Sequence, residues 1–572
     1  MDEGRTGFGE RLRGGLDRLR AGLAPWRHGA RWELLLGALV LGLLGYSWMY
    51  ADITVPNERT RAYLVVSVVD HGTLSIDQAV ERYGPVNDWA RRDGHYYTDK
   101  APGSSLLGVV PYWVARRFTK AEDWKIAEVI NLMRTWVMLP IALVGFFWMR
   151  RLLRRLDQPP AVVDLASLAW TLGTTAFHYG TAFYGHQIVA VCLVGALDLV
   201  LRAEQAVAGG PPSPSGAGAG DATAEAAGAA GAPRPRPWRA FRLPVLGAGL
   251  LAGLAGLTEY QAGIPAALLA LYVVSGPLRR RPTATAMLVL GALPFVVLLF
   301  GYNTLAFGGP FRLSYQFLVD PGLRELHGQG IGGVGTPHAS YLWGGLFSLH
   351  RGFFTTSPIL LLALPGLVLL GRQGRPRLAV LLGAALVYFF AFIAGTKIWH
   401  GNWSFGSRLL VPVMGWAMVP AAFCATALRR WRTTDAMVRG LALAGFAYHQ
   451  AVHAVFPELP ENATNPVIDA VLPALRGPHV SPNLATRLFG WHGRLSLLPL
   501  LLLATLAGAA MLRGVGERRS WDERAGFVAA ALGTALVLAL IVLIHKPGWN
   551  PGDVRWFTDW LAHLAQVEDS VR

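Results

Sequence analysis

The stretch Ile359–Ala394 reads ILLLALPGLVLLGRQGRPRLAVLLGAALVYFFAFIA. Two apolar runs flank the short segment Arg372–Arg377, whose charged residues are all arginines. Together with the apolar residues that precede the first run, each run reaches the roughly 17–25 residues needed to cross the hydrocarbon core of a bilayer. Loops rich in Lys and Arg face the cytoplasm. The stretch therefore predicts two membrane-spanning helices joined by a cytoplasmic turn.

Apolar runs and arginine-rich segments alternate in the same way along the whole chain. Seven segments carry 30 of the 52 Lys+Arg residues, and all 30 are arginines. These segments are Met1–Arg31, Arg150–Asp157, Arg202–Arg242, Arg279–Arg281, Arg372–Arg377, Arg429–Arg439 and Arg513–Arg524. The net charge of +16 therefore reflects membrane topology. Nucleic-acid binding would need basic residues gathered on one face, so no nucleic-acid partner is expected.

The composition indicates an all-α polytopic membrane protein. Of the 572 residues, 53% are hydrophobic and only 15% are charged, whereas soluble domains are nearer 25% charged. Apolar runs between the arginine segments predict about thirteen transmembrane helices. The predicted spans are 32–50, 126–149, 161–179, 183–201, 243–258, 262–278, 283–306, 353–371, 378–396, 409–428, 437–456, 494–512 and 524–545.

The spans divide the chain into a simple organisation. Residues 1–31 form a basic cytoplasmic segment, and residues 32–545 form the membrane domain. Within that domain, residues 51–125 form the first and longest outer loop, and the Gly/Ala/Pro-rich residues 206–237 form a disordered cytoplasmic loop. An odd number of spans puts residues 546–572 outside. We expect a plasma (inner) membrane protein with a cytoplasmic N-terminus.

Few ionisable residues lie within the predicted spans. The main exceptions are Glu128, Arg134, Asp164 and Asp198, and each lies near a span end. Transport pathways usually place such residues deep within the spans. The polar residues gather in the outer loops instead, which favours an enzyme that acts at the membrane interface.

Two further patterns limit the chemistry. Two cysteines exclude a disulfide framework and a cysteine-based zinc site, and His449 and His453 share a helix face without a third ligand. No metal ligands are therefore predicted. Gly249-x-x-x-Gly253 lies inside a span, so it predicts close helix packing and not a nucleotide-binding loop.

The first outer loop contains two predicted helices. Asn57–Val69 forms the first, and Pro102–Phe118 forms an apolar helix that lies in the membrane interface and is broken at Pro111. The residues between them are expected to be a turn-rich connector, with Gly94 and Pro102 as breakers.

These motifs resemble the GT-C class of membrane glycosyltransferases. The resemblance is to bacterial relatives of protein O-mannosyltransferases and of the lipid A aminoarabinose transferase. The first loop has an Asn-Glu-x-x-Arg helix (from Asn57), then HGTLSID and DGHYYTDKAPGSSLL. Further similar patches are GLTEYQAG (Gly256–Gly263), LFSLHRGFFTTSPILLL (Leu346–Leu362) and WHGNWSFGSRLLVPVM (Trp399–Met414).

The resemblance implies an activity and a catalytic group. Such enzymes transfer a sugar from a polyprenyl-phosphate donor to an acceptor on the non-cytoplasmic face, and a carboxylate accepts the acceptor's proton. The family has an Asp-Glu pair where this chain has Asn57-Glu58. Because asparagine is not a base, we expect Asp99 of the Asp-Lys-Ala-Pro motif to serve, followed by Glu58 and Asp52.

The leaving phosphate requires cations, and the sugar requires polar partners. We expect Lys100, Arg408 and Arg351 to bind the phosphate. Residues expected in the acceptor or sugar pocket are Asp88, His400 and Asn402. The alternative for each is structural: an ion pair that caps a helix, a snorkelling arginine or a solvated loop residue. No cofactor is required by these motifs, and a divalent metal is left open.

Partners and alternatives follow from this assignment. The expected partners are a polyprenyl-phosphate-linked sugar, the lipid bilayer and an acceptor that is a glycan, a lipid or a protein. One alternative is a transporter or flippase of lipid-linked glycans, which would carry charges deep in its spans. Another is a catalytically inactive GT-C-like binding subunit, which Asn57 favours.

Overall fold

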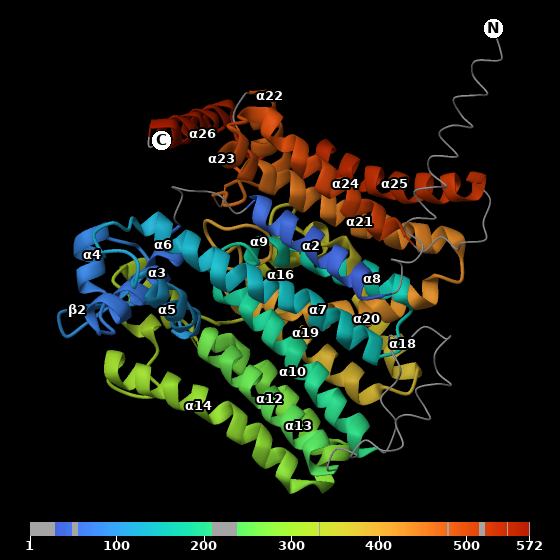
Figure 1. Ribbon diagram of the computed structural model, residues 1–572, viewed down its shortest axis with the longest axis horizontal. Coiled ribbons are helices and arrows are strands. Elements are labelled where there is room, and N and C mark those ends of the chain that lie inside the picture. Colours follow the sequence, from blue (N-terminus) through green and yellow to red (C-terminus); the bar gives the residue numbers. More distant parts are fainter. Residues whose placement is uncertain are drawn as a thin grey trace.

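The computed structural model describes residues 29–47, 55–208, 237–330, 332–460, 462–477, 480–513, 521–545 and 547–570. Asp52, most of the N-terminal segment 1–31 and most of the low-complexity loop 206–237 lie outside the described residues. Nearly all of the described chain that is regular is helical, and the fold class is all-α (Figure 1).

Each of the thirteen predicted spans is helical over most of its length. The helices that match them are α2 (Ala30–Ser47), α6 to α7 (Ile126–Arg155, including η3), α8 (Pro160–Leu172) with α9 (Ala176–Tyr179), α10 (Gly185–Val207), α12 (Pro237–Thr258), α13 (Gly263–Ser275), α14 (Pro282–Phe307), α17 (Phe353–Thr356) with η8 (Pro358–Leu362) and α18 (Ala363–Arg372), α19 (Pro376–Gly395), α20 (Val411–Leu428), α21 (Arg432–Val455), η11 (Gly493–Leu497) with α24 (Leu498–Leu512), and α25 (Trp521–Ile544). Among the described residues, eight helices are long and apolar enough to cross a membrane. The chain is therefore a multi-pass membrane protein, and thirteen crossings stay a prediction.

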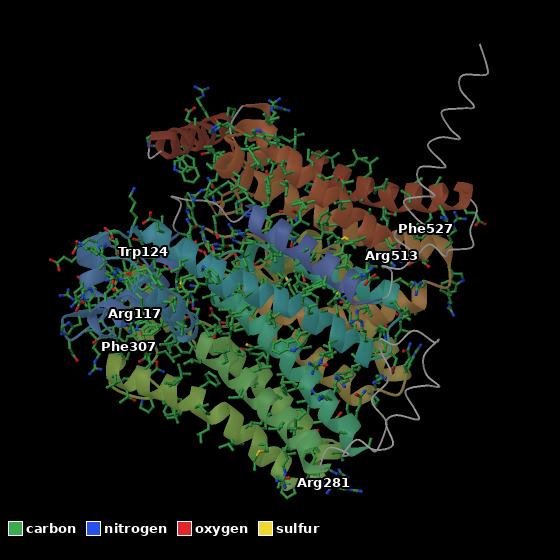
Figure 2. All side chains as sticks on the ribbon, in the orientation of Figure 1. Arg117, Trp124, Arg281, Phe307, Arg513 and Phe527 are labelled. Atoms are coloured by element: carbon green, nitrogen blue, oxygen red, sulfur yellow. The ribbon has the colours of Figure 1, made fainter. Side chains whose placement is uncertain are left out.

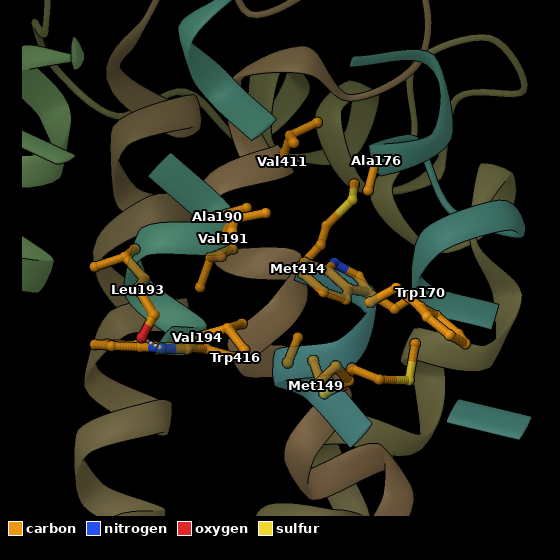
Figure 3. Close-up of a cluster of buried hydrophobic side chains, with 14 of the residues drawn as sticks. Met149, Trp170, Ala176, Ala190, Val191, Leu193, Val194, Val411, Met414 and Trp416 are labelled. Atoms are coloured by element: carbon orange, nitrogen blue, oxygen red, sulfur yellow. Dashed lines mark hydrogen bonds between the residues drawn. The ribbon is translucent and has the colours of Figure 1, made fainter. Parts of the chain in front are cut away.

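Helices α10 and α20 form the centre of the bundle, and α14 and α25 form its edges (Figure 1). In the most apolar 18-residue stretch of each helix, 89% of the residues are buried in Gly185–Val207 (α10) and in Arg408–Leu428 (η9 with α20). The buried share is only 17% in α14 and 11% in α25. Figure 3 shows the packing between the central helices, where the Trp416 Nε1 group donates a hydrogen bond to the Leu193 carbonyl oxygen at 2.9 Å. The exposed leucines and valines of α14 and α25 form the apolar surface that a lipid bilayer requires.

Glycines let α12 and α14 approach closely, as the Gly249-x-x-x-Gly253 pattern predicts. A Cβ atom on Gly249 would lie 2.1 Å from the Leu288 carbonyl oxygen, and one on Gly291 would lie 2.2 Å from the Leu246 carbonyl oxygen. Larger residues would force the two backbones apart. The prediction of close helix packing is confirmed.

Arginines of two predicted arginine segments and residues of the first loop lie at opposite ends of the bundle (Figure 2). Figure 2 shows Arg281 and Arg513 at the end away from Arg117, Trp124 and Phe307. We call these the arginine end and the loop end.

Buried ion pairs fix the charged residues near the arginine end. Arg150 binds Glu33 at 2.6 Å and Asp164 at 2.8 Å. Asp198 binds Arg151 and Arg155, both at 2.8 Å. The span acids Asp164 and Asp198 are therefore structural.

The remaining elements lie in the loops that connect the bundle helices along the chain, and α26 follows the last of these helices. Those of the first loop are α3 (Pro56–Val66), η2 (Ser67–His71), α4 (Asp77–Tyr83), β1 (Trp89–Arg92), β2 (His95–Thr98) and α5 (Gly103–Ala115). Later connections contain η5 (Tyr260–Ala262), η6 (Pro277–Arg280), η7 (Ser314–Phe317), α15 (Pro321–Gly328), α16 (Ala339–Phe347), η9 (Arg408–Leu410), η10 (Val467–Val471), α22 (Leu472–Arg476), α23 (Leu484–Phe489) and the C-terminal α26 (Pro551–Ser570).

The first loop corrects two predictions. Helix α5 continues through Pro111, because proline's fixed φ is itself helical and only one backbone hydrogen bond is lost. The expected connector contains the antiparallel hairpin β1–β2, which turns at Asp93 and Gly94 with positive φ at both residues (50° and 89°). An Asp-Gly turn of this kind matches the twist of a two-residue hairpin.

Candidate functional site

A cavity of about 1160 Å³ lies at the loop end of the bundle. Its walls come from the start of α3, both ends of the hairpin, the start of α10, the junction of α12 and η5, the connection 313–337 and the connection 396–409. Ionisable side chains from all these elements line it: Arg61, Asp88, Asp99, Lys100, His186, Glu259, His327, Lys397 and Arg408.

Lys100 lies between two carboxylates on one wall of the cavity. Its ammonium group is 2.7 Å from Asp99 Oδ2 and 3.1 Å from Asp88 Oδ2. The hairpin produces this arrangement, because its register pairs Trp89 with Thr98 and so brings the residue before β1 opposite the residue after β2. The sequence predictions Asp88, Asp99 and Lys100 therefore come together in space.

Burial changes the protonation of this group. Burial raises the pKa of Asp99 to about 6, against the opposing effect of the Lys100 charge, and the charge of Asp88 adds to the rise. Burial alone would lower the pKa of Lys100, but the two carboxylates outweigh it and raise that pKa. Asp99 Oδ1 is buried without a hydrogen-bond partner among the described residues. A proton donor or a cation of a bound ligand would satisfy it.

A second charged group surrounds Arg61, whose side chain is almost fully buried. The Arg61 guanidinium donates to Asn57 Oδ1 at 3.0 Å, to Glu259 Oε1 at 2.9 Å and to Ser104 Oγ. His186 Nδ1 lies 3.9 Å from Glu259 Oε1, too far for a hydrogen bond, and has no partner among the described residues. Sequence reasoning assigned no role to Arg61, Glu259 or His186.

Glu58 lies outside the cavity lining. Its carboxylate accepts hydrogen bonds from Arg134 Nε at 2.9 Å, from Arg134 Nη2 and from the Phe183 backbone amide at 2.6 Å. Both side chains of the ion pair are at least 94% buried. The structure therefore places Glu58 in an internal ion pair between α3 and η3 (Arg134–Met138).

Arg408 and Lys397 also line the cavity, and they come from the connection 396–409, far from the first loop in sequence. The Arg408 guanidinium lies 5.7 Å from the centre of the Tyr184 ring, and its Nε is buried without a hydrogen-bond partner among the described residues. Lys100 and Arg408 are thus brought to one cavity although about 300 residues separate them.

Arg351 holds the connection that carries Asn402. Its guanidinium donates to the His400 carbonyl oxygen, to Ser404 Oγ at 2.6 Å and to the Leu459 carbonyl oxygen at 3.3 Å. Asn402 lines the cavity with a left-handed φ of 56°, which asparagine tolerates better than most residues. Neither Arg351 nor His400 is part of the cavity lining.

Aromatic rings form another wall. Tyr260 and Tyr315 pack edge to face at 5.7 Å, and Tyr315 stacks on His327 at 4.4 Å. Burial lowers the pKa of His327 to about 4, so this imidazole is neutral near pH 7. Within the described part of the chain, no three His, Cys, Asp or Glu side chains are arranged to hold a metal ion.

The fold and this site define a multi-pass α-helical membrane protein with a charged, aromatic-walled cavity at one end of its bundle. No protein-family model matches the chain, and no curated protein sequence is similar to it. The structure is similar to that of ArnT from Cupriavidus metallidurans bound to undecaprenyl phosphate, with 15% identity and a TM-score of 0.46 over 89% of this chain and 78% of that one.

Two structures from Archaeoglobus fulgidus are also similar. One is its oligosaccharyltransferase in the apo form, with 13% identity and a TM-score of 0.41 over 91% of this chain. The other is AglB with an inhibitory peptide and a dolichol-phosphate, with 13% identity and a TM-score of 0.40 over 91% of this chain. This chain spans 57% and 56% of their lengths. Since all three TM-scores are below 0.5, any functional conclusion depends on the residues of the cavity.

Proposed function

We propose that the protein is a glycosyltransferase that moves a sugar from a polyprenyl-phosphate donor to an acceptor at the non-cytoplasmic face of the membrane. The observation that carries this proposal is the cavity itself. It joins cations suited to a leaving phosphate, carboxylates suited to proton transfer and aromatic rings suited to a sugar face in one chamber. The first-loop motifs that resemble GT-C enzymes supply part of this wall.

Lys100 and Arg408 are proposed to bind the phosphate of the donor. The Lys100 side chain is 16% exposed, and Arg408 has a buried Nε without a hydrogen-bond partner among the described residues. Charge-assisted hydrogen bonds from such groups stabilise the negative charge that develops on a leaving phosphate. Arg351 is proposed to act indirectly, because its hydrogen bonds hold the connection that carries Asn402.

Asp99 and Asp88 are proposed to set the charge of Lys100. A divalent cation between these carboxylates would have to displace the Lys100 ammonium group, which already contacts both. Asp99 thus lies beside the proposed leaving phosphate and touches the donor site.

The sugar and acceptor are proposed to bind between the phosphate cations and the aromatic wall. The rings of Tyr260 and Tyr315 offer faces for the C–H groups of a sugar, and Asn402 offers an amide for hydroxyl groups. His400 supports this connection, because its Nδ1 accepts a hydrogen bond from the backbone N–H of Asn402 at 3.2 Å.

Lipid analysis in cells tests the proposal and identifies the sugar at the same time. We expect a strain that lacks the gene to accumulate one polyprenyl-phosphate sugar, which mass spectrometry of its lipid extract would identify. A transporter would leave the donor unspent on the other face, and an inactive binding subunit would not release polyprenyl phosphate in vitro. An unchanged lipid extract, together with no release by the purified protein, would contradict the proposal.

A further inference from the structure

The proposed reaction needs a base that the first-loop motif does not contain. The acceptor hydroxyl must lose its proton as the sugar is transferred, and a carboxylate is suited to accept it near neutral pH. Position 57 carries an amide. Glu58 is enclosed by Arg134 and the Phe183 amide, and it does not line the cavity.

Asp99 is poorly placed for this step. Its Oδ2 contacts Lys100 at 2.7 Å, and Lys100 is the proposed ligand of the leaving phosphate. In a direct displacement, the attacking oxygen approaches the anomeric carbon from the side opposite the leaving oxygen. A carboxylate bonded to the phosphate cation therefore lies on the wrong side of the sugar.

Glu259 brings a carboxylate to the cavity from a different part of the chain. It lies between α12 and η5 in an extended conformation (φ −145°, ψ 126°), so the helix breaks where the side chain enters the cavity. A carboxylate within a largely apolar stretch is costly, and such residues usually have a functional role. The fold also reserves space for it, because a Cβ atom on Gly185 would lie 2.2 Å from Glu259 Oε1.

The contacts of Glu259 connect it directly to Asn57. The Arg61 guanidinium holds both Asn57 Oδ1 and Glu259 Oε1, while Ser104 occupies its remaining edge. Arg61 therefore orients Glu259, with three of its five N–H donors engaged in these contacts. Glu259 lines the cavity, and among the described residues no group donates a hydrogen bond to its Oε2, so this oxygen can accept one from a ligand.

We propose that Glu259 is the general base and replaces in space the carboxylate that position 57 lacks. This inference rests on the proposed function. The acceptor oxygen forms a bond to the anomeric carbon, and the bond from that carbon to the phosphate oxygen breaks. The acceptor's proton moves to Glu259 Oε2, and the electron pair of the broken bond leaves with the polyprenyl phosphate.

Relocation of the carboxylate tests this assignment. Turnover of the donor identified from the gene-deletion strain is measured in lipid nanodiscs as release of polyprenyl phosphate. We expect Glu259→Gln to lose about 10²–10⁴-fold in kcat, as expected for a lost general base. The kcat of the double variant Asn57→Asp/Glu259→Gln should be at least about tenfold higher than that of Glu259→Gln. The matched control is Glu325→Gln, the same change at an exposed carboxylate on α15.

A second readout separates a base from a structural partner of Arg61. In Glu259→Ala, added acetate should restore more turnover than added formate at equal concentration, because proton transfer follows the basicity of the rescuing carboxylate. Binding of decaprenyl phosphate to the same variant should stay within about threefold of wild type, which shows a folded cavity.

The outcomes are distinct. Glu259→Gln turnover within about threefold of wild type would overturn the inference while leaving the proposed function intact. Equal rescue by formate and acetate would also overturn it and would make Glu259 a positioning residue for Arg61. Failure of the wild-type protein to release polyprenyl phosphate from any polyprenyl-phosphate sugar would contradict the proposed function and the inference with it.

Discussion

Asp99 links the charge of the phosphate site to pH. Its pKa is raised by burial to about 6. Above this pH its carboxylate competes for Lys100 and repels a phosphate, and below this pH both effects vanish. We expect the affinity for the donor, a phosphodiester, to rise roughly three- to tenfold from about pH 7.5 to about pH 5. If bound phosphate raises the pKa of Asp99 by one unit, protonation of Asp99 raises the affinity for that phosphate about tenfold.

Titration of binding in nanodiscs measures this dependence. Asp99→Asn should bind with a flat profile, at the affinity that wild type reaches at low pH. His327, with a pKa of about 4, stays neutral over most of that range. A wild-type affinity that falls on acidification would show that Asp99 does not compete with the phosphate.

The buried ion pair of Glu58 with Arg134 predicts a structural role for this carboxylate. Its loss leaves the buried Arg134 guanidinium without its carboxylate, and breaking a buried ion pair typically costs about 3–5 kcal/mol. We expect Glu58→Gln to lower the thermal stability of the purified protein strongly, whereas the folded fraction keeps its kcat. Thermal unfolding monitored by size exclusion measures this, with Glu128→Gln, which neutralises a helix-capping carboxylate, as the control. Wild-type stability with lost turnover would return Glu58 to the catalytic residues.

The hairpin is the element that assembles the phosphate site. Gly94 has a φ of 89°, a conformation that a β-branched residue strongly disfavours. We expect Gly94→Val to weaken donor binding by roughly 10-fold or more, because distortion of about 1–2 kcal/mol at the turn displaces Lys100 from its position in the cavity wall. Asp93→Asn is the matched control, since asparagine accepts a positive φ. Equal donor affinity in both variants would show that the hairpin does not position Lys100.

The helical elements were predictable from sequence, and the hairpin was only partly so. Apolar runs between arginine segments locate every bundle helix to within a few residues, because a bilayer demands both length and apolarity. Asp93-Gly94 was the available signal for the hairpin, but the residues around it lack the apolar alternation typical of strands. Glu259 carried a signal too, as a single acid in an apolar stretch.

Long-range pairing could not be read from the chain. Nothing local connects Arg61 to Glu259, nearly 200 residues later, or Glu58 to Arg134. These contacts decide which of two neighbouring residues, 57 or 58, faces the cavity. The cavity brings together the predicted residues Asp88, Asp99, Lys100, Asn402 and Arg408. Sequence reasoning missed Arg61, Glu259 and His186, whose contacts join distant elements.

The whole molecule has two chemically different ends. Arginine ion pairs occupy one end, and the cavity occupies the other. The C-terminal helix α26 lies at the loop end, because the Trp556 ring packs 6.5 Å from the ring of Trp403 in the cavity lining. That the C-terminal residues and the first loop share the outer side of the membrane stays a prediction.

Sidedness follows from the arginine pattern and can be measured in cells. We expect a cysteine at Asp93 to react with an impermeant thiol reagent added outside intact cells, and a cysteine at Gly220 to react only after permeabilisation. The native Cys192 and Cys424 are buried and serve as the unlabelled background. Reaction of position 220 in intact cells would invert the proposed topology.

The central claim is that the cavity transfers a sugar from a polyprenyl-phosphate donor. The most direct measurement is release of polyprenyl phosphate by purified wild-type protein in nanodiscs, supplied with an envelope extract of the gene-deletion strain as the source of acceptor, across a panel of polyprenyl-phosphate hexoses and pentoses. We predict release from one member of the panel, and a roughly 10- to 100-fold rise in its KM for Lys100→Met, the effect of one lost charged hydrogen bond, with Lys120→Met unchanged. No release from any donor, or equal KM values for wild type and Lys100→Met, would contradict this claim.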